Sequence, residues 1–182
     1  ELASEALPAL RYIREDTLGL TPARLRGIRE AQGELLVFVD DDNVLAPNYL
    51  EEALNIYREH PKLGAFGGSI APEFETPPPE WTRPYWYLLA IRETAEDHVS
   101  MQYGDAAAEP CGAGLCVRRE IADRYAGYLS DDSIRRALDR SGDSLASAGD
   151  MDLVYTAFDC EYGIGRFRSL VLDHLIPPSR LT

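Results

Sequence analysis

The sequence predicts a single α/β domain, and two observations lead to that prediction. Strand-like apolar runs alternate with helical patterns along the chain. One of these runs, residues 35–39, ends in three consecutive aspartates, at the end of a strand where open α/β sheets bind their ligands. The 182 residues, 45% hydrophobic and 27% charged, suffice for one domain with a full core. No internal repeat is visible, so we expect one domain over 1–182.

The first part of the chain reads as alternating helices and strands. Gly19 interrupts the pattern, and Thr21 and Pro22 then supply an N-cap and a first-turn proline for a helix. Leu50 and Tyr57 belong to the apolar stripe of a second, amphipathic helix. We therefore expect, in order, a helix tail over 2–8, a strand over 11–14, a helix over 21–31, a strand over 35–39, a helix over 47–60 and a strand over 63–71.

Composition changes after this point. Five prolines between residues 72 and 84 predict an extended loop. Weak patterning over 98–110 indicates an edge strand followed by a mobile loop. The other expected elements are a helix over 85–94, a turn and strand over 112–117, a helix over 118–125, a surface helix over 131–140, a helix over 145–158 and a strand over 164–173.

Charge and cysteine content narrow the function. The formal net charge of −13 argues against nucleic-acid binding, which needs a basic face, and a phosphate ligand would need a metal or local arginines. No apolar run approaches the ~20 residues that span a bilayer, and no signal peptide is visible. The odd set Cys111, Cys116 and Cys160 lacks zinc-finger spacing and indicates reduced thiols. We expect a cytoplasmic protein, and peripheral membrane attachment is compatible with this.

The aspartate run 40–42 has two readings. Three adjacent carboxylates repel one another unless a cation or strong donors gather there, which favours a divalent-metal site for a phosphorylated substrate. Alternatively, the run is an acidic turn before the next helix, where Asp and Asn are common.

Five further features can each be interpreted in two ways, as functional or as structural. Asp150 and Asp152 are either a general base and its neighbour or a plain helix cap. Gly112 either lets backbone approach a ligand or shapes a turn, and His174 is either a ligand or a structural residue. Arg24 and Arg26 either reach a diphosphate or form the solvated face of their helix. Trp81 either stacks on a sugar or packs a loop against the core.

Taken together, these motifs resemble the inverting family-two glycosyltransferases with a GT-A fold. The resemblance is carried in chain order by four segments: 19–34 with the strand ending in Asp40-Asp41-Asp42, 111–119, 149–153 and 174–182. Leu25 stands where that family usually has Asn, and Gly149 where an acid often precedes the base. The resemblance implies a GT-A, Rossmann-like mixed sheet flanked by helices.

The resemblance also implies roles in metal-dependent, inverting transfer from a nucleotide-diphosphate sugar to a hydroxyl of a glycan, polysaccharide or lipid-linked acceptor. Asp150 would be the catalytic base, and Asp42 with His174 would hold Mn²⁺ or Mg²⁺. Two groups of residues complete the implied site: Asp40, Asp41, Arg24 and Arg26 on the donor side, and Trp81, Gly112 and Asp152 on the acceptor side, with 72–110 as the acceptor-side loop region.

The family's first βαβ unit has no counterpart here, and Glu1 reads as lying within the helix or loop that follows it. We therefore expect an N-terminally incomplete domain with an open sheet edge. Such an edge predicts self-association as a homo-oligomer and weak or absent donor binding by this segment alone.

Two other functions compete. Residues 40–45 after an apolar strand also resemble the first motif of haloacid-dehalogenase-type phosphatases, in which Asp40 would be phosphorylated, although Lys62, the only lysine, lies far upstream of Asp150. The second is a truncated transferase-like subunit that keeps the fold without turnover.

Overall fold

The computed structural model describes residues 10–138 and 148–181. Within them, six strands form one mixed sheet in the order β1-β5-β3-β6-β2, and β4 also pairs with β6. Only the central pair, β3 with β6, is parallel among these pairings. The strands are β1 (Leu35–Phe38), β2 (Asn43–Leu45), β3 (Leu63–Phe74), β4 (His98–Ser100), β5 (Leu115–Arg118) and β6 (Gly163–Ile176).

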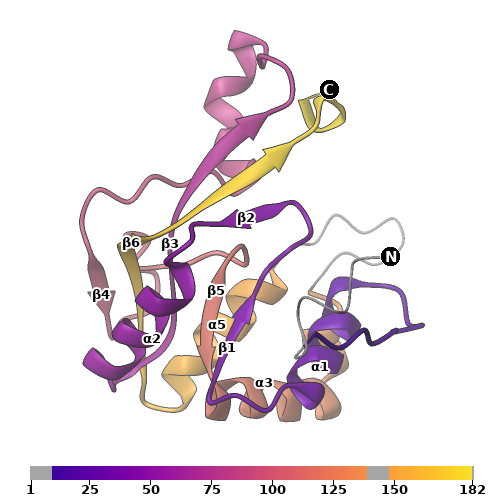
Figure 1. Ribbon diagram of the computed structural model, residues 1–182. Coiled ribbons are helices and arrows are strands. Elements are labelled where there is room, and N and C mark those ends of the chain that lie inside the picture. Colours follow the sequence, from indigo (N-terminus) through magenta and orange to yellow (C-terminus); the bar gives the residue numbers. More distant parts are fainter. Residues whose placement is uncertain (1–9, 139–147, 182) are drawn as a thin grey trace.

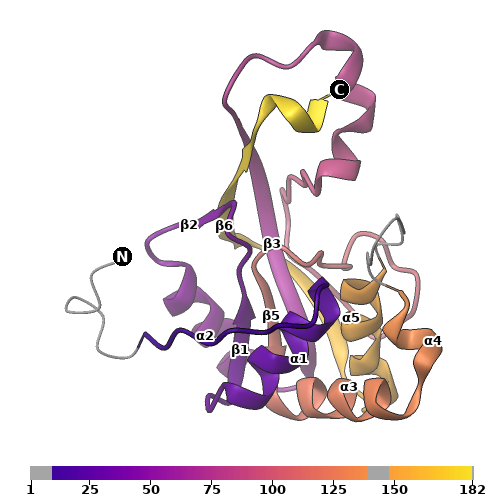
Figure 2. The same ribbon diagram turned by 90° about the vertical axis from the view of Figure 1, so that its right-hand side faces the viewer.

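Helices cover both faces of the sheet (Figures 1 and 2). On β5, Leu115 and Val117 belong to the core that contains α1, α3 and α5, whereas Cys116 between them belongs to the core with α2. This alternation follows from the two-residue period of a strand. The helices are α1 (Leu20–Glu30), α2 (Tyr49–Glu59), α3 (Arg119–Asp131), the short α4 (Ser133–Arg136) and α5 (Gly149–Asp159).

The parallel strands β3 and β6 extend beyond the rest of the sheet as an arm (Figure 2). Their register runs from Leu63 opposite Gly163 to Phe74 opposite Ile176, with a shift after Gly68. A Cβ at Gly68 would lie 2.0 Å from the carbonyl oxygen of Leu170, so this close approach requires glycine. Two 3₁₀ helices, η1 (Glu80–Leu89) and η2 (Pro178–Leu181), follow the two strands of the arm.

Arg118, at the end of β5, ties the sheet to the C-terminal end of α2. Its guanidinium donates to the carbonyl oxygens of Leu63 (2.6 Å), Tyr57 (2.7 Å) and His60 (3.1 Å). The same group lies over the Tyr57 ring, 3.9 Å from its centroid. Because Arg118 is only 8% exposed, these contacts satisfy a buried charge and fix α2 against the sheet.

Several sequence expectations about elements were wrong. Residues 11–14 form no strand; Tyr12 is 91% exposed, and no strand within 10–138 and 148–181 pairs with this segment. The loop expected over 72–84 is shorter, because Pro72 continues β3 opposite His174 and η1 begins at Glu80. The helix expected over 118–125 runs on to Asp131 as α3, while the described part of 131–140 holds only the one-turn α4. The helix tail over 2–8 lies outside the described residues.

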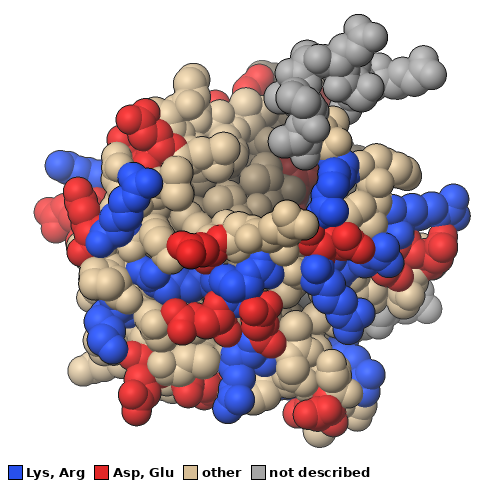
Figure 3. Space-filling view, turned by 60° about the horizontal axis from the view of Figure 1, so that its bottom comes forward, with Lys and Arg blue, Asp and Glu red and all other residues tan. Residues whose placement is uncertain are grey.

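Charges of both signs are interspersed on the face at the bottom of Figure 1 (Figure 3). Ion pairs illustrate this balance: Arg119 lies 3.6 Å from Asp123, and Arg26 lies 3.0 Å from Glu30. No helix within the described ranges is both long and apolar enough to cross a bilayer.

Candidate active site

A cleft of about 350 Å³ opens where α1, the turn after β1, the end of η1, the loop before β5 and the start of α5 converge. The C-terminal end of β6 and η2 complete its wall. The lining residues are Leu20, Arg24, Asp40, Asp41, Asp42, Asn43, Leu88, Leu89, Ala90, Cys111, Gly112, Ala113, Asp150, His174 and Arg180.

The acidic run forms the turn between β1 and β2. The backbone N–H of Asn43 donates to the carbonyl oxygen of Asp40 at 3.1 Å, which closes the turn. Leu175 N–H donates to the carbonyl oxygen of Asp42 at 2.8 Å, and Asn43 pairs with His174 in the antiparallel β2–β6 ladder. The pairing of β2 with β6 therefore brings His174 beside the acidic turn.

Asp42 is the centre of this part of the cleft. Its Oδ2 lies 3.3 Å from Nε2 of His174 and accepts a hydrogen bond from Nη2 of Arg180 at 3.1 Å. Its Oδ1 accepts from the side-chain amide of Asn43 at 3.0 Å. Each carboxylate oxygen therefore has at least one polar neighbour.

The ring of His174 faces two acceptors. Its Nδ1 lies 2.9 Å from the carbonyl oxygen of Leu89, which can only accept, so Nδ1 carries a proton. Its Nε2 faces Oδ2 of Asp42, where a neutral ring has a lone pair. Either a second ring proton or a cation between the two atoms resolves this opposition. A backbone carbonyl on Nδ1 is also the usual arrangement behind a metal-bound Nε2.

A divalent cation fits between Asp42 and His174 only if water and substrate supply its remaining ligands. The described residues contain no group of three or more His, Cys, Asp or Glu side chains arranged to hold a metal ion. A cation between Asp42 and His174 would therefore take its other ligands from water and substrate. Mg²⁺ is commonly bound through one or two carboxylates together with water and substrate phosphates.

Arg24 brings a positive charge to the same cleft from α1, and it is only 7% exposed. Burial raises the pKa of the Asp40 carboxyl, and Asp42 adds to that increase, whereas Arg24 acts in the opposite direction. A Cβ built on Gly112 would lie 3.0 Å from Nη2 of Arg24. Gly112 therefore leaves the space that the guanidinium needs.

Asp150 lies in the first turn of α5 and lines the cleft with the acidic turn. Its Oδ2 accepts the backbone N–H of Gly112 at 3.0 Å, and its Oδ1 accepts the backbone N–H of Met151 at 3.0 Å. These two donors hold the carboxylate in one orientation. The arrangement can present a fixed base opposite a site for a cation and phosphate.

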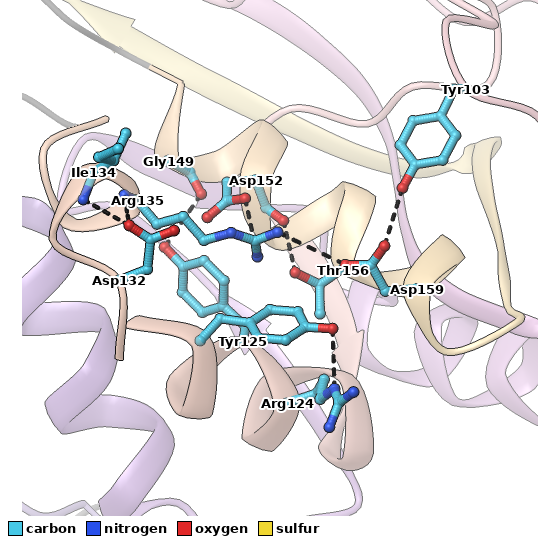
Figure 4. A network of polar contacts seen from close by, with 11 residues as sticks. Tyr103, Arg124, Tyr125, Asp132, Ile134, Arg135, Gly149, Asp152, Thr156 and Asp159 are labelled. Carbon is cyan, nitrogen blue, oxygen red and sulfur yellow. Dashed lines mark hydrogen bonds and ion pairs between the residues drawn. The ribbon is translucent and has the colours of Figure 1, made fainter. Parts of the chain in front are cut away.

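Three residues expected at the site are not among the described residues that line this cleft. Arg26 pairs with Glu30 along α1. Trp81 is 63% exposed on η1 and makes an edge contact with Tyr85. The remaining residue, Asp152, faces the other side of α5, where its Oδ1 lies 3.4 Å from Nη1 of Arg135 (Figure 4).

Sequence reasoning assigned no role to Arg180, Asn43 or the carbonyl of Leu89. Asn43 was visible as the polar residue that ends the acidic run. The contact of Arg180 with Asp42 depends on η2 turning back toward β2, a contact between residues 138 positions apart. The local sequence contains no signal for it.

Three comparisons place the chain among known proteins. The family model described as Glycosyl transferase family 2 matches residues 1–125. The Glucosyl-dolichyl phosphate glucuronosyltransferase of Haloferax volcanii is 20% identical over 117 residues, covering 64% of this chain and 36% of that protein. A crystal structure of GalNAc-T7 with UDP, GalNAc and Mn²⁺ superposes with a TM-score of 0.52 at 15% identity, covering 87% of this chain and 30% of that one. This likeness confirms the GT-A fold expected from the sequence.

Proposed function

The chain belongs to the family-2 glycosyltransferases, and from that membership we propose that its cleft binds a nucleotide-diphosphate sugar whose sugar the whole protein transfers to a hydroxyl acceptor. One observation carries the proposal: the acidic turn 40–42 and the carboxylate of Asp150 line a single cleft. The chain spans about a third of the curated relative that it matches, 36% of its length.

On the donor side, Asp40 lies near the ribose, with Asp41 beside it, and Arg24 lies near the diphosphate. Asp42 with His174 would hold Mn²⁺ or Mg²⁺. A bound divalent cation offsets the charge that develops on the leaving diphosphate. Arg24 adds a fixed cation near the same place, which matters because carboxylates dominate the cleft. We keep Arg26 as an outer donor-side residue.

On the acceptor side, Asp150 is the general base. A carboxylate oxygen takes the proton of the acceptor hydroxyl while that oxygen forms a bond to the anomeric carbon. The bond from this carbon to the diphosphate oxygen breaks, and the diphosphate leaves with the electron pair. Attack from the face opposite the leaving group inverts the anomeric centre, so one protein base suffices.

The acceptor is a glycan, a polysaccharide or a lipid-linked hydroxyl, contacted by Gly112 and the 72–110 region, whereas Asp152 faces Arg135 on the other side of α5 and does not contact the acceptor. Leu88, Leu89 and Ala90 line the cleft at the end of η1, and exposed Trp81 lies on the same helix. The Haloferax volcanii relative is named for a dolichyl phosphate, a lipid, which supports a lipid-linked acceptor and peripheral contact with a membrane. β1 ends the described sheet, so its outer edge can pair with a strand of a second copy.

The phosphatase alternative is not favoured. It requires a lysine near the phosphorylated aspartate, and the only lysine in the sequence is Lys62. Its Nζ lies 5.7 Å from the ring centroid of Tyr162, and Lys62 does not line the cleft with Asp40.

Calorimetry with Mn²⁺ and UDP tests the proposal. We expect the wild-type chain to bind Mn²⁺, and Asp42→Ala to abolish that binding. Asp173→Ala is the matched control, because exposed Asp173 adjoins His174 on β6 but does not line the cleft. Binding of Mn²⁺ with weak or absent binding of UDP would match the donor binding expected of this segment alone, whereas binding of neither ligand would instead support a non-catalytic subunit.

A further inference from the structure

Two nitrogen atoms converge on one carboxylate oxygen in the cleft. Oδ2 of Asp42 lies 3.1 Å from Nη2 of Arg180 and 3.3 Å from Nε2 of His174. The other oxygen, Oδ1, is occupied by the side-chain amide of Asn43. Oδ2 is therefore the oxygen that a divalent cation held by Asp42 and His174 would use, and Arg180 is already bound to it.

We propose that Arg180 and the divalent cation compete for Oδ2 of Asp42, and that Arg180 moves to the donor diphosphate when the cation binds. This inference rests on the proposed function. A guanidinium and a divalent cation on one oxygen atom would repel strongly at such short separation. Binding of the cation therefore requires Arg180 to leave Asp42.

The position of Arg180 allows this movement. Its side chain is 47% exposed and stands on the short turn η2, where Arg180 N–H donates to the carbonyl oxygen of Pro177 at 3.0 Å. By contrast, His174 is 4% exposed and fixed through Leu89. Arg180 can thus change partner while the metal-facing histidine stays in place.

The diphosphate is a suitable second partner. A guanidinium can bind phosphate oxygens through two parallel hydrogen bonds. The present contact of Arg180 with Asp42 uses only one nitrogen, so a diphosphate would bind Arg180 through more hydrogen bonds. Arg180 lines the same cleft as Arg24, so the two guanidiniums can approach one diphosphate from different walls. The exchange would link the two binding events, because the cation releases the group that the diphosphate then binds.

The test measures two affinities in Arg180→Gln. Mn²⁺ alone should bind about threefold more tightly, because the removed competitor is a partly exposed ion pair of modest strength. UDP at saturating Mn²⁺ should bind about tenfold or more weakly, because a charge-assisted contact with phosphate is lost. Titration calorimetry of each ligand, and the electron paramagnetic resonance signal of free Mn²⁺, report these changes without any activity assay.

Two further variants complete the design. Arg58→Gln removes an exposed cation on α2 outside the cleft and should change neither affinity, which controls for net charge. Arg180→Lys keeps the charge without the planar fork, so it should retain wild-type Mn²⁺ affinity and lose part of the UDP affinity.

The outcomes separate the two proposals. Opposite changes in Mn²⁺ and UDP affinity for Arg180→Gln support the exchange. If Arg180→Gln has unchanged affinities, or binds both ligands more weakly, the exchange is overturned. In that case the proposed function still stands, provided that the wild-type chain binds Mn²⁺ and UDP. Failure of the wild-type chain to bind either ligand overturns the proposed function and the exchange with it.

Discussion

Nε2 of His174 lies 3.3 Å from Oδ2 of Asp42, although 132 positions separate the two residues in the sequence. The contact exists because β2 pairs with β6 and places Asn43 opposite His174. This pairing joins the acidic turn to the C-terminal segment, across the cleft from the carboxylate of Asp150.

We expect His174→Ala to weaken Mn²⁺ binding at least tenfold, because it removes one of two proposed protein ligands and its support from Leu89. Calorimetry at pH 7 measures this loss. His98→Ala, on β4 and away from the cleft, is the control and should bind Mn²⁺ like the wild type. Equal affinities for all three proteins would exclude His174 as a ligand.

Asp150→Asn should lower turnover of the full-length enzyme by about 10²–10⁴-fold, because an amide cannot accept the acceptor proton. Affinity for UDP should stay unchanged, since the amide oxygen can still accept from the Gly112 N–H. Asp152→Asn, two positions further along α5, is the matched control. Because Asp152 faces Arg135 on another side of the helix, we expect a much smaller loss of turnover. If Asp150→Asn retains turnover within tenfold of the wild type, another group is the base.

Gly112→Ala should reduce turnover about tenfold with a small change in stability. The new methyl group would lie 3.0 Å from Nη2 of Arg24 and 3.3 Å from Oδ2 of Asp150, so these groups must shift, and small misplacements of reacting groups are costly. Gly127→Ala, in α3 with no atom within 4 Å of the new methyl, should leave turnover unchanged. Steady-state kinetics and thermal unfolding of both variants measure these effects.

Arg118→Met should lower the free energy of unfolding by about 2–4 kcal/mol, because three carbonyl groups lose their buried donor. Urea denaturation gives this difference. Arg58→Met, on the exposed side of α2, should change it by no more than about 0.5 kcal/mol. A similar small change in Arg118→Met would mean that water replaces its contacts.

Cys111 should react slowly with iodoacetamide at pH 7. Burial raises the pKa of its thiol, so the reactive thiolate is scarce at neutral pH and the rate should keep rising above pH 9. Because Cys111 lines the cleft, UDP with Mn²⁺ should slow the reaction further, as mass spectrometry of the labelled peptide can show. Cys160 does not line the cleft and is the internal control; equal protection of both thiols would point to a global change.

The sequence indicated many of the residues that line the candidate site, because they are concentrated in short motifs. The acidic turn lies at the end of a predicted strand, and Asp150 lies at the start of a predicted helix. Both line one cleft in the folded sheet. The direction in which a single side chain points was harder to predict from the sequence. Asp152 lies two positions from Asp150 on α5 and therefore points to another side of the helix, toward Arg135.

Local patterns also failed where tertiary pairing decided the structure. Residues 11–14 have a strand-like composition but no partner strand. Pro72 continues β3 because the partner β6 accompanies it, although prolines usually indicate a loop. The role of Arg180 depends on a contact with Asp42 across 138 positions, which no local window contains.

The long-range pairing of β2 with β6 has a consequence for how this protein reaches a working state. Sliding one strand by a single residue would present Asp173 where the imidazole belongs, leaving an extra anion facing the acidic turn. A chain whose last strand has not yet docked therefore has no imidazole in its cleft. Chemical competence should consequently depend on this non-local pairing, a kind of contact that forms slowly because a long loop must close first.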